Sequence, residues 1–125
     1  MGTKGVHGEG QRPDGRNLIA EAIDRGYTVV RTRDELLSLP TSGDKVLGLF
    51  AWDATFNDKP EEILKEKGLT NFDPEAPTVA EMTDTAIRIL SAGGERFLLV
   101  VEEEATDNMG NNNNASGTLE AAPGG

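Results

Sequence analysis

FLLVVEEEATD, residues 97–107, is the stretch that decides the fold, because five apolar residues run directly into a group of acidic ones. An uninterrupted apolar run of this length is typical of a strand buried on both faces of a parallel sheet. Carboxylates at the C-terminal end of such a strand lie where open α/β sheets place their ligand and metal sites. The stretch therefore predicts a strand over residues 96–101 followed by a hard-cation site. In the alternative interpretation, residues 102–104 form only a solvated turn.

Helical and strand patterns alternate upstream of this stretch. Residues 27–30 and 45–50 are short runs rich in β-branched or apolar residues, which predict two further strands. The pairs Thr32/Glu35 and Thr78/Glu81 have capping-box spacing, and each predicts the start of a helix. Alternation with short connections predicts an α/β fold whose parallel strands are joined by right-handed crossovers. Helices are predicted from about residue 14 or 17 to the cap at Gly26, and over residues 32–37, 60–68 and 79–90.

Residues 51–77 differ in character from the rest of the chain. They are polar, carry Trp52, Phe56 and Phe72, and contain one short helical pattern. We interpret this segment as an insertion over the sheet edge. Its aromatic side chains are expected to form a local core more readily than a platform for substrate.

Composition excludes several classes of function. The chain has 22 acidic and 12 basic residues, a formal net charge of −10, and no basic stripe, which argues against a nucleic-acid partner. No window reaches the roughly 18 apolar residues of a membrane span, and the first residues lack the apolar core of a signal peptide. The absence of cysteine excludes disulfides and thiolate metal sites, but it leaves the compartment open.

The ends of the chain do not have the pattern of domain ends. A helical pattern begins at Thr118 and stops in Pro123-Gly124-Gly125. We therefore expect residues 1–125 to be a fragment of a larger domain.

Four stretches of the sequence resemble one family, the alkaline phosphatases. They occur in the order of the family's own pattern and span roughly residues 14 to 122. The stretches are DGRNL with GYTVV (14–18 and 26–30), VLGLFA (46–51), PTVAEMT (77–83) and FLLVVE leading to Asp107 (97–102). The resemblance implies part of a doubly wound parallel α/β sheet and a metal-dependent phosphomonoesterase that acts on phosphate monoesters. It also implies a homodimer when the protein is full-length, and a periplasmic or extracellular location.

The resemblance implies roles for three residues. Glu102 falls on the family's magnesium ligand, and Asp107 falls on one of its zinc ligands. Asn111 occupies the position of a histidine zinc ligand, and an amide oxygen is a poor replacement for imidazole, so zinc should be held weakly there or give way to a harder cation. Glu103 replaces the family's usual glycine and adds negative charge. Asn112 or Asn113 would substitute for the histidine if the loop shifted, but Asn111–Asn114 is equally well interpreted as a solvated polar loop.

The nucleophile that the family uses is not found in this chain. None of Ser38, Ser42, Ser91 and Ser116 lies in the Asp-Ser-Ala context expected of it. The sole histidine, His7, lies in a glycine-rich stretch without a partner at metal-binding spacing, and we interpret it as a solvated loop residue. The chain alone is therefore predicted to be inactive, with the remainder of the full-length enzyme supplying the missing groups.

Two other functions are compatible with the residues. The chain could be a non-catalytic acidic domain whose residues 102–114 bind calcium or nothing, although Met109 breaks the known helix-loop-helix calcium pattern. It could also belong to a paralogue in which loss of the histidine has turned catalysis into binding of phosphate or a phosphate ester, with Ca²⁺ or Mg²⁺. Flanking sequence with an Asp-Ser-Ala nucleophile would decide for the hydrolase.

Overall fold

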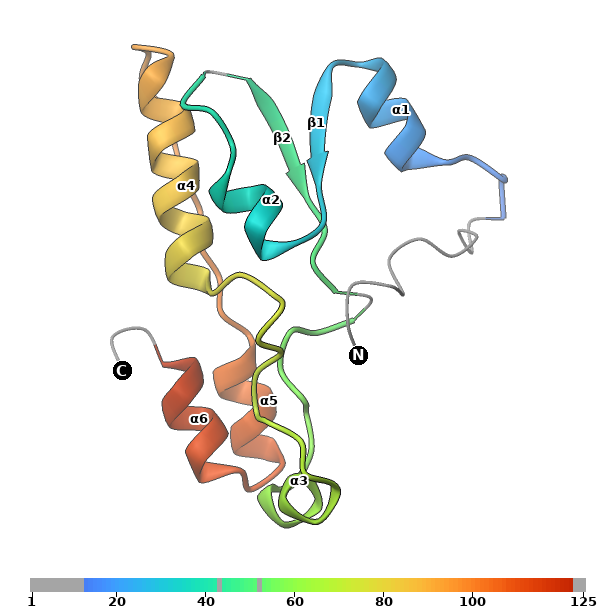
Figure 1. Cartoon of the computed structure of the whole chain (residues 1–125), viewed down its shortest axis with the longest axis vertical. Helices are drawn as coiled ribbons and strands as arrows, with labels where there is room; N and C mark the ends of the chain where they lie inside the picture. Colours follow the sequence, from blue (N-terminus) through green and yellow to red (C-terminus); the bar gives the residue numbers. More distant parts are fainter. Residues whose placement is uncertain (1–12, 43, 52, 123–125) are drawn as a thin grey trace.

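The computed structural model describes residues 13–42, 44–51 and 53–122, which form six helices and two strands (Figure 1). His7 and Trp52 lie outside the described residues. One end of the molecule holds the strands with α1 and α2, and the other end holds α3, α5 and α6, with α4 alongside the strands. The elements are α1 (Leu18–Asp24), β1 (Tyr27–Val30), α2 (Arg33–Leu37), β2 (Lys45–Gly48), α3 (Glu61–Lys67), α4 (Val79–Ala92), α5 (Ala105–Asn111) and α6 (Ala115–Ala121).

The strands β1 and β2 are parallel, as the sequence predicted. They are in register from Tyr27 opposite Lys45 to Val30 opposite Gly48, and α2 is the crossover between them. The side chains of Val30, Leu36, Phe50 and Ala76 form a buried cluster beside the sheet, against which Met82 of α4 packs. This β–α–β unit is a partial α/β fold.

The prediction of a third strand over residues 96–101 is wrong for the described chain. The described residues form a two-stranded sheet, and residues 96–101 run as extended chain without strand pairing. Leu98 is 88% exposed and Val100 is 80% exposed, whereas the prediction required burial on both faces. A strand of this kind needs a hydrogen-bonded neighbour and covering helices, and the described residues place neither beside it.

Both predicted capping boxes are present. The Thr32 hydroxyl accepts a hydrogen bond from the Glu35 amide, and the Thr78 hydroxyl accepts one from the Glu81 amide. In each box the glutamate carboxylate in turn accepts a hydrogen bond from the backbone amide of the threonine. Gly68 ends α3 in the left-handed conformation, at φ 62°, where glycine carries no steric penalty. These helix ends are decided by residues only a few positions apart.

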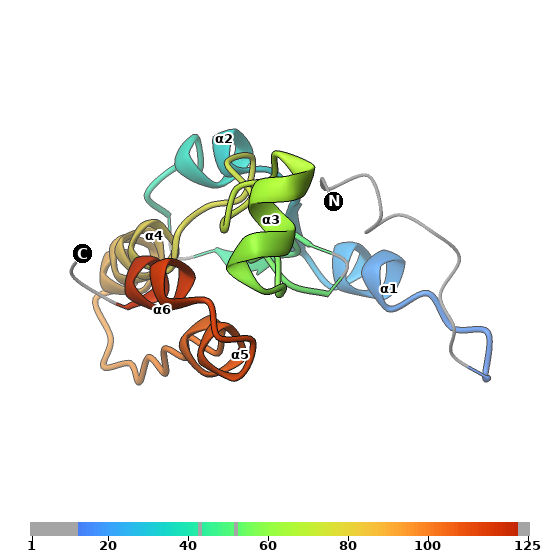
Figure 2. The same cartoon turned by 90° about the horizontal axis from the view of Figure 1, so that it is seen from below.

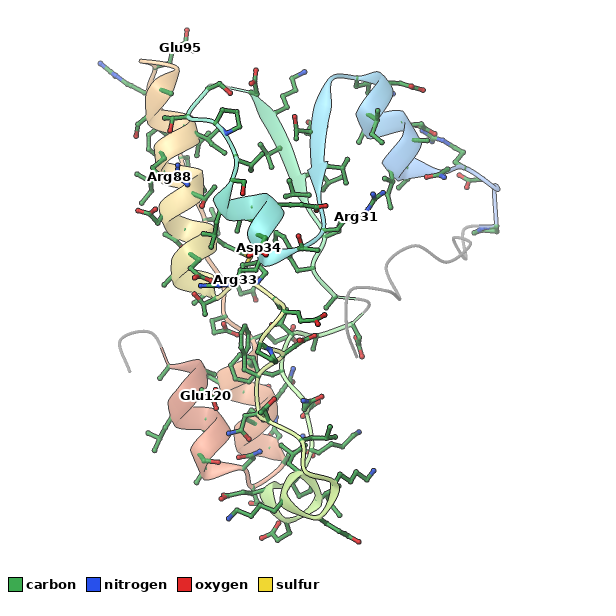
Figure 3. The ribbon with its side chains drawn as sticks, viewed as in Figure 1. Arg31, Arg33, Asp34, Arg88, Glu95 and Glu120 are labelled. Atoms are coloured by element: carbon green, nitrogen blue, oxygen red, sulfur yellow. The ribbon has the colours of Figure 1, made fainter. Side chains whose placement is uncertain are left out.

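An ion pair joins α2 to α4. Arg33 points from α2 toward the start of α4 (Figure 3), and its guanidinium lies 2.5 Å from the Glu81 carboxylate. The hydrogen bond from Arg33, followed by that from the Thr78 amide, lowers the pKa of Glu81 from 4.5 to about 2. The same carboxylate therefore caps α4 and anchors α2.

Residues 51–77 pack against α5 and α6. Phe56 and Phe72 form an antiparallel bridge, and their rings meet edge to face with centroids 5.2 Å apart. Phe56 joins Ala105, Met109 and Ala121 in a second buried cluster. The expectation that Phe56 and Phe72 form a local core is confirmed, while the interpretation of 51–77 as an insertion over the sheet edge stays a prediction.

Candidate functional site

The acidic stretch leads into a helix, α5, which the sequence analysis did not predict. Glu102 is exposed and lies between the extended residues 97–101 and the first turn of α5. Glu103 has a structural task, because its carboxylate accepts a hydrogen bond of 3.0 Å from the Ala105 amide. A carboxylate at a helix N-terminus satisfies an amide that has no partner within the helix. Glu103 therefore fixes the start of α5.

Asp107 and Asn111 lie one turn apart on the exposed side of α5. The Asn111 amide Nδ2 donates a hydrogen bond of 3.1 Å to Asp107 Oδ2. Met109, which is fully buried, faces the second cluster and so fixes which side of α5 is exposed. The structure thus brings Asp107 and Asn111 together, and it shows the Asn111 side chain donating to the carboxylate.

Glu104 and Asn108 face a cleft on another side of α5. The cleft has a volume of about 540 Å³ and lies between α5 and the loop before α3. Asp53 and Asp58 line its opposite wall. The cleft is therefore lined by three carboxylates and one basic residue, Lys59, and its net negative charge favours cations over anions.

The described residues contain part of a metal site at most. Within residues 13–42, 44–51 and 53–122, no group of three or more histidine, cysteine, aspartate or glutamate side chains is arranged to hold a metal ion. The donors that Glu102 and Asp107 offer are carboxylate oxygens, which suit Mg²⁺ and Ca²⁺ and are also accepted by Zn²⁺. No ion pair links either residue to a basic side chain in the described chain, and Asp107 accepts its hydrogen bond from Asn111.

The serines have no catalytic arrangement in the described chain. Ser38 ends α2, and Ser42 donates to Asp44. Ser91 is exposed on α4. Ser116 donates to Asn114 Oδ1 at 3.1 Å. That the nucleophile lies in another part of the protein stays a prediction.

The asparagine tract is not a solvated loop throughout. Asn113 is exposed with φ 53°, but Asn114 is fully buried and Asn112 is half-buried. The Asn112 amide donates to the Asp58 carboxylate and, at 2.9 Å, to the Asn108 carbonyl. Sequence reasoning missed Asn114 and its partner Asn71. The signal that could have found Asn114 is the preference of asparagine for the residue before a helix.

Comparison with known proteins identifies the family of this chain. The structure superposes on the crystal structure of Thermus thermophilus alkaline phosphatase with a TM-score of 0.66 and 34% identity, covering 89% of this chain and 21% of that one. The family model for alkaline phosphatase matches residues 2–122. The chain belongs to the alkaline phosphatase family.

Sequence relatives agree with this assignment. The alkaline phosphatase of Gadus morhua is 36% identical over 98 residues, which are 74% of this chain and 18% of the relative. The membrane-bound alkaline phosphatase of Bombyx mori is 36% identical over 121 residues, which are 91% of this chain and 19% of the relative. Alkaline phosphatase 3 of Bacillus subtilis is 34% identical over 104 residues, covering 83% and 20% respectively. The chain thus spans about a fifth of the length of the relatives it matches.

Among the described residues, no helix is both long enough and apolar enough to cross a bilayer.

Proposed function

We propose that the full-length protein hydrolyses phosphate monoesters with the help of bound metal ions, and that this chain supplies part of its metal site. The observation that carries the proposal is the family match over residues 2–122, which includes the acidic residues 102–104 and α5. The position of Glu102 and Asp107, exposed and without basic partners in the described chain, is compatible with this role.

Each residue of the candidate site has a distinct task in this proposal. Glu102 binds Mg²⁺, and Asp107 binds a second ion, Zn²⁺ or a harder cation in its place. Asn111 orients the Asp107 carboxylate through its hydrogen bond and is a weak substitute for a histidine ligand. When bound, such ions stabilise negative charge on a phosphoryl group and activate water.

The other parts of the enzyme come from the remainder of the full-length protein. These are the serine nucleophile and the further metal ligands, so we propose that the present chain is inactive alone. We further propose that the full-length protein is a homodimer that acts in the periplasm or outside the cell. One matched relative is named as membrane-bound, which is compatible with a location at the cell surface.

The test is hydrolysis of an aryl phosphate by the full-length protein, stripped of metal and reloaded with Mg²⁺ and Zn²⁺. Hydrolysis should need added metal, and Glu102→Ala and Asp107→Ala should each lower kcat/KM by at least about tenfold, as loss of metal-site groups does. The control is Glu66→Ala, which removes an exposed carboxylate of α3 and should change nothing. Metal binding without hydrolysis would favour the non-catalytic domain or the binding paralogue, and equal activity of all three variants would refute the site.

A further inference from the structure

Asn114 lies at a junction between α5, α6 and the residues that flank α3. We propose that it is a positioning residue that fixes α5, and with it Asp107, against the loop before and after α3. The role for Asp107 rests on the proposed function, whereas the junction itself is geometry. The zinc ion is implied by the family, whereas the contacts of Asn114 are all made by residues of this chain.

The Asn114 side chain uses its full hydrogen-bonding capacity without any contact with solvent. Its Nδ2 donates to the Lys59 carbonyl at 3.1 Å and to Asn71 Oδ1 at 3.0 Å. Its Oδ1 accepts from the Gly117 amide at 2.8 Å and from the Ser116 hydroxyl at 3.1 Å. The side chain is 0% exposed. An amide has two donors and two acceptor positions, and here all four are used.

The backbone of Asn114 continues the junction. Its amide donates to the Met109 carbonyl in α5 at 2.9 Å, and its carbonyl accepts from the Thr118 amide in α6 at 2.9 Å. Asn114 is thus the N-cap of α6 and also holds the C-terminal end of α5.

The two segments that flank α3, to which Asn114 is hydrogen-bonded, are joined to each other by backbone hydrogen bonds. The Asn57 amide donates to the Asn71 carbonyl at 2.7 Å, and the Asp73 amide donates to the Thr55 carbonyl at 2.8 Å. The Asn71 side chain continues to α6, where it donates to Glu120 Oε2 at 2.9 Å. Figure 2 shows α3, α5 and α6 gathered at this end of the molecule, and Figure 3 places Glu120 on α6. The chain around α3 is therefore a frame to which α5 is attached.

The attachment matters because α5 is short. A helix of seven residues is not stable in isolation and takes its position from its contacts. Its contacts are the buried side chains of Ala105 and Met109 on one face, and the bonds of Asn112 and Asn114 at its end. If the Asn114 bonds are lost, α5 can rotate or fray, and the Asp107 carboxylate moves with it.

No other residue type supplies these four bonds. Aspartate matches the shape of asparagine but brings a buried charge and no donors, so the Lys59 carbonyl and Asn71 would face a carboxylate. Alanine leaves the same groups unpaired. Asn114→Asp is therefore the sharpest variant. Asn17→Asp is the matched control, because it makes the same change at another helix N-cap, an exposed residue before α1 whose side-chain oxygen accepts from the Ala20 amide and which aspartate caps equally well.

The experiment uses the full-length protein and measures zinc affinity by competition with a chromophoric chelator, together with thermal unfolding. The affinity is measured at a temperature where circular dichroism shows each variant fully folded. We expect Asn114→Asp to weaken zinc binding by about 10–100-fold, the range found when groups that orient metal ligands are removed. Asn17→Asp should stay within about twofold of the unchanged protein. Ser116→Ala, which removes one of the four bonds, serves if Asn114→Asp does not fold and should weaken zinc binding by a smaller factor.

The outcomes separate this inference from the function on which it rests. Weaker zinc binding by Asn114→Asp or Ser116→Ala, with Asn17→Asp unaffected, would support positioning. A lowered unfolding temperature with unchanged zinc affinity would overturn it, because Asn114 would then stabilise the fold only. An unchanged protein that binds neither zinc nor magnesium would overturn the proposed function before any variant is made.

Discussion

The contact between α5 and α6 depends on Gly117, and replacing this glycine by alanine tests the packing directly. Gly117 is buried on α6 where it crosses α5. An added Cβ would lie 2.8 Å from Met109 Sδ and 3.0 Å from Asn114 Oδ1. The Met109 sulfur is near the end of a flexible side chain and can move aside. The Asn114 oxygen is held by two hydrogen bonds, so α6 itself must shift away from it.

The size of the effect is a balance of two terms. Overpacking a filled site costs about 1–3 kcal/mol of stability, and because the added Cβ would meet two atoms at 3.0 Å or less, Gly117→Ala belongs in the upper part of that range, at about 2–3 kcal/mol. Alanine in place of glycine within a helix returns about 1 kcal/mol. Gly117→Ala should therefore destabilise α6 by about 1–2 kcal/mol, which corresponds to a change of about 5–30-fold in the equilibrium for opening.

Native-state hydrogen exchange measures this opening at single amides. The Thr118 amide, which donates to the Asn114 carbonyl, should exchange about 5–30-fold faster in Gly117→Ala. Gly110→Ala is the matched control, since its Cβ would approach no atom closer than Thr118 Oγ1 at 3.9 Å and α5 should become more stable. Unchanged exchange in Gly117→Ala, or equal effects of the two substitutions, would refute the close packing of α5 on α6.

Two further predictions concern charge and the metal. Because the pKa of Glu81 is lowered to about 2, its stabilising effect is complete above its ordinary value of 4.5 and is lost as the pH falls from there toward 2. The Arg33 and Glu81 side chains are 43% and 24% exposed, so solvent screening limits the effect to about 1 kcal/mol. Urea unfolding at pH 7 and pH 3 should show it, and in Arg33→Ala, but not Lys65→Ala, most of this pH dependence should disappear. In the full-length protein, Asn111→His should raise zinc affinity and phosphatase rate together, since imidazole is the better zinc ligand. If Asn111→His raises neither zinc affinity nor phosphatase rate, and Glu102→Ala changes neither, then these residues do not take part in a metal site.

The elements that the sequence predicted are those whose causes are local. The two capping boxes and Gly68 place helix ends through contacts between residues a few positions apart, and the structure contains all of them. The parallel pairing of β1 with β2 follows from the short crossover through α2, which was also predicted. The family assignment was predictable for a related reason, because short motifs in a fixed order carry it.

The arrangement of the candidate site could not be predicted in the same way. Asn114 meets Lys59 and Asn71, which are 55 and 43 positions away, and nothing in a run of asparagines shows which one is buried. Glu103 was assigned only extra negative charge at a metal site, whereas its carboxylate caps α5. Helix α5 itself was missed because ATDNMGN has few apolar residues, and a helix that buries only Ala105 and Met109 leaves almost no periodic signal.

The wrong strand at residues 96–101 shows where local reasoning ends. Apolar and β-branched residues fit a pleated surface, but their preference depends on the neighbours that the surface supplies. In the described chain Phe97 is 45% exposed and Val101 is 50% exposed, Leu99 is only half-buried, and the run pairs with neither strand of the sheet. A contiguous exposed apolar run is unusual in a monomer and typically marks a surface that another segment or partner covers. The pattern therefore indicates what residues 96–101 need, and the structure shows that this need is not met from within the described residues.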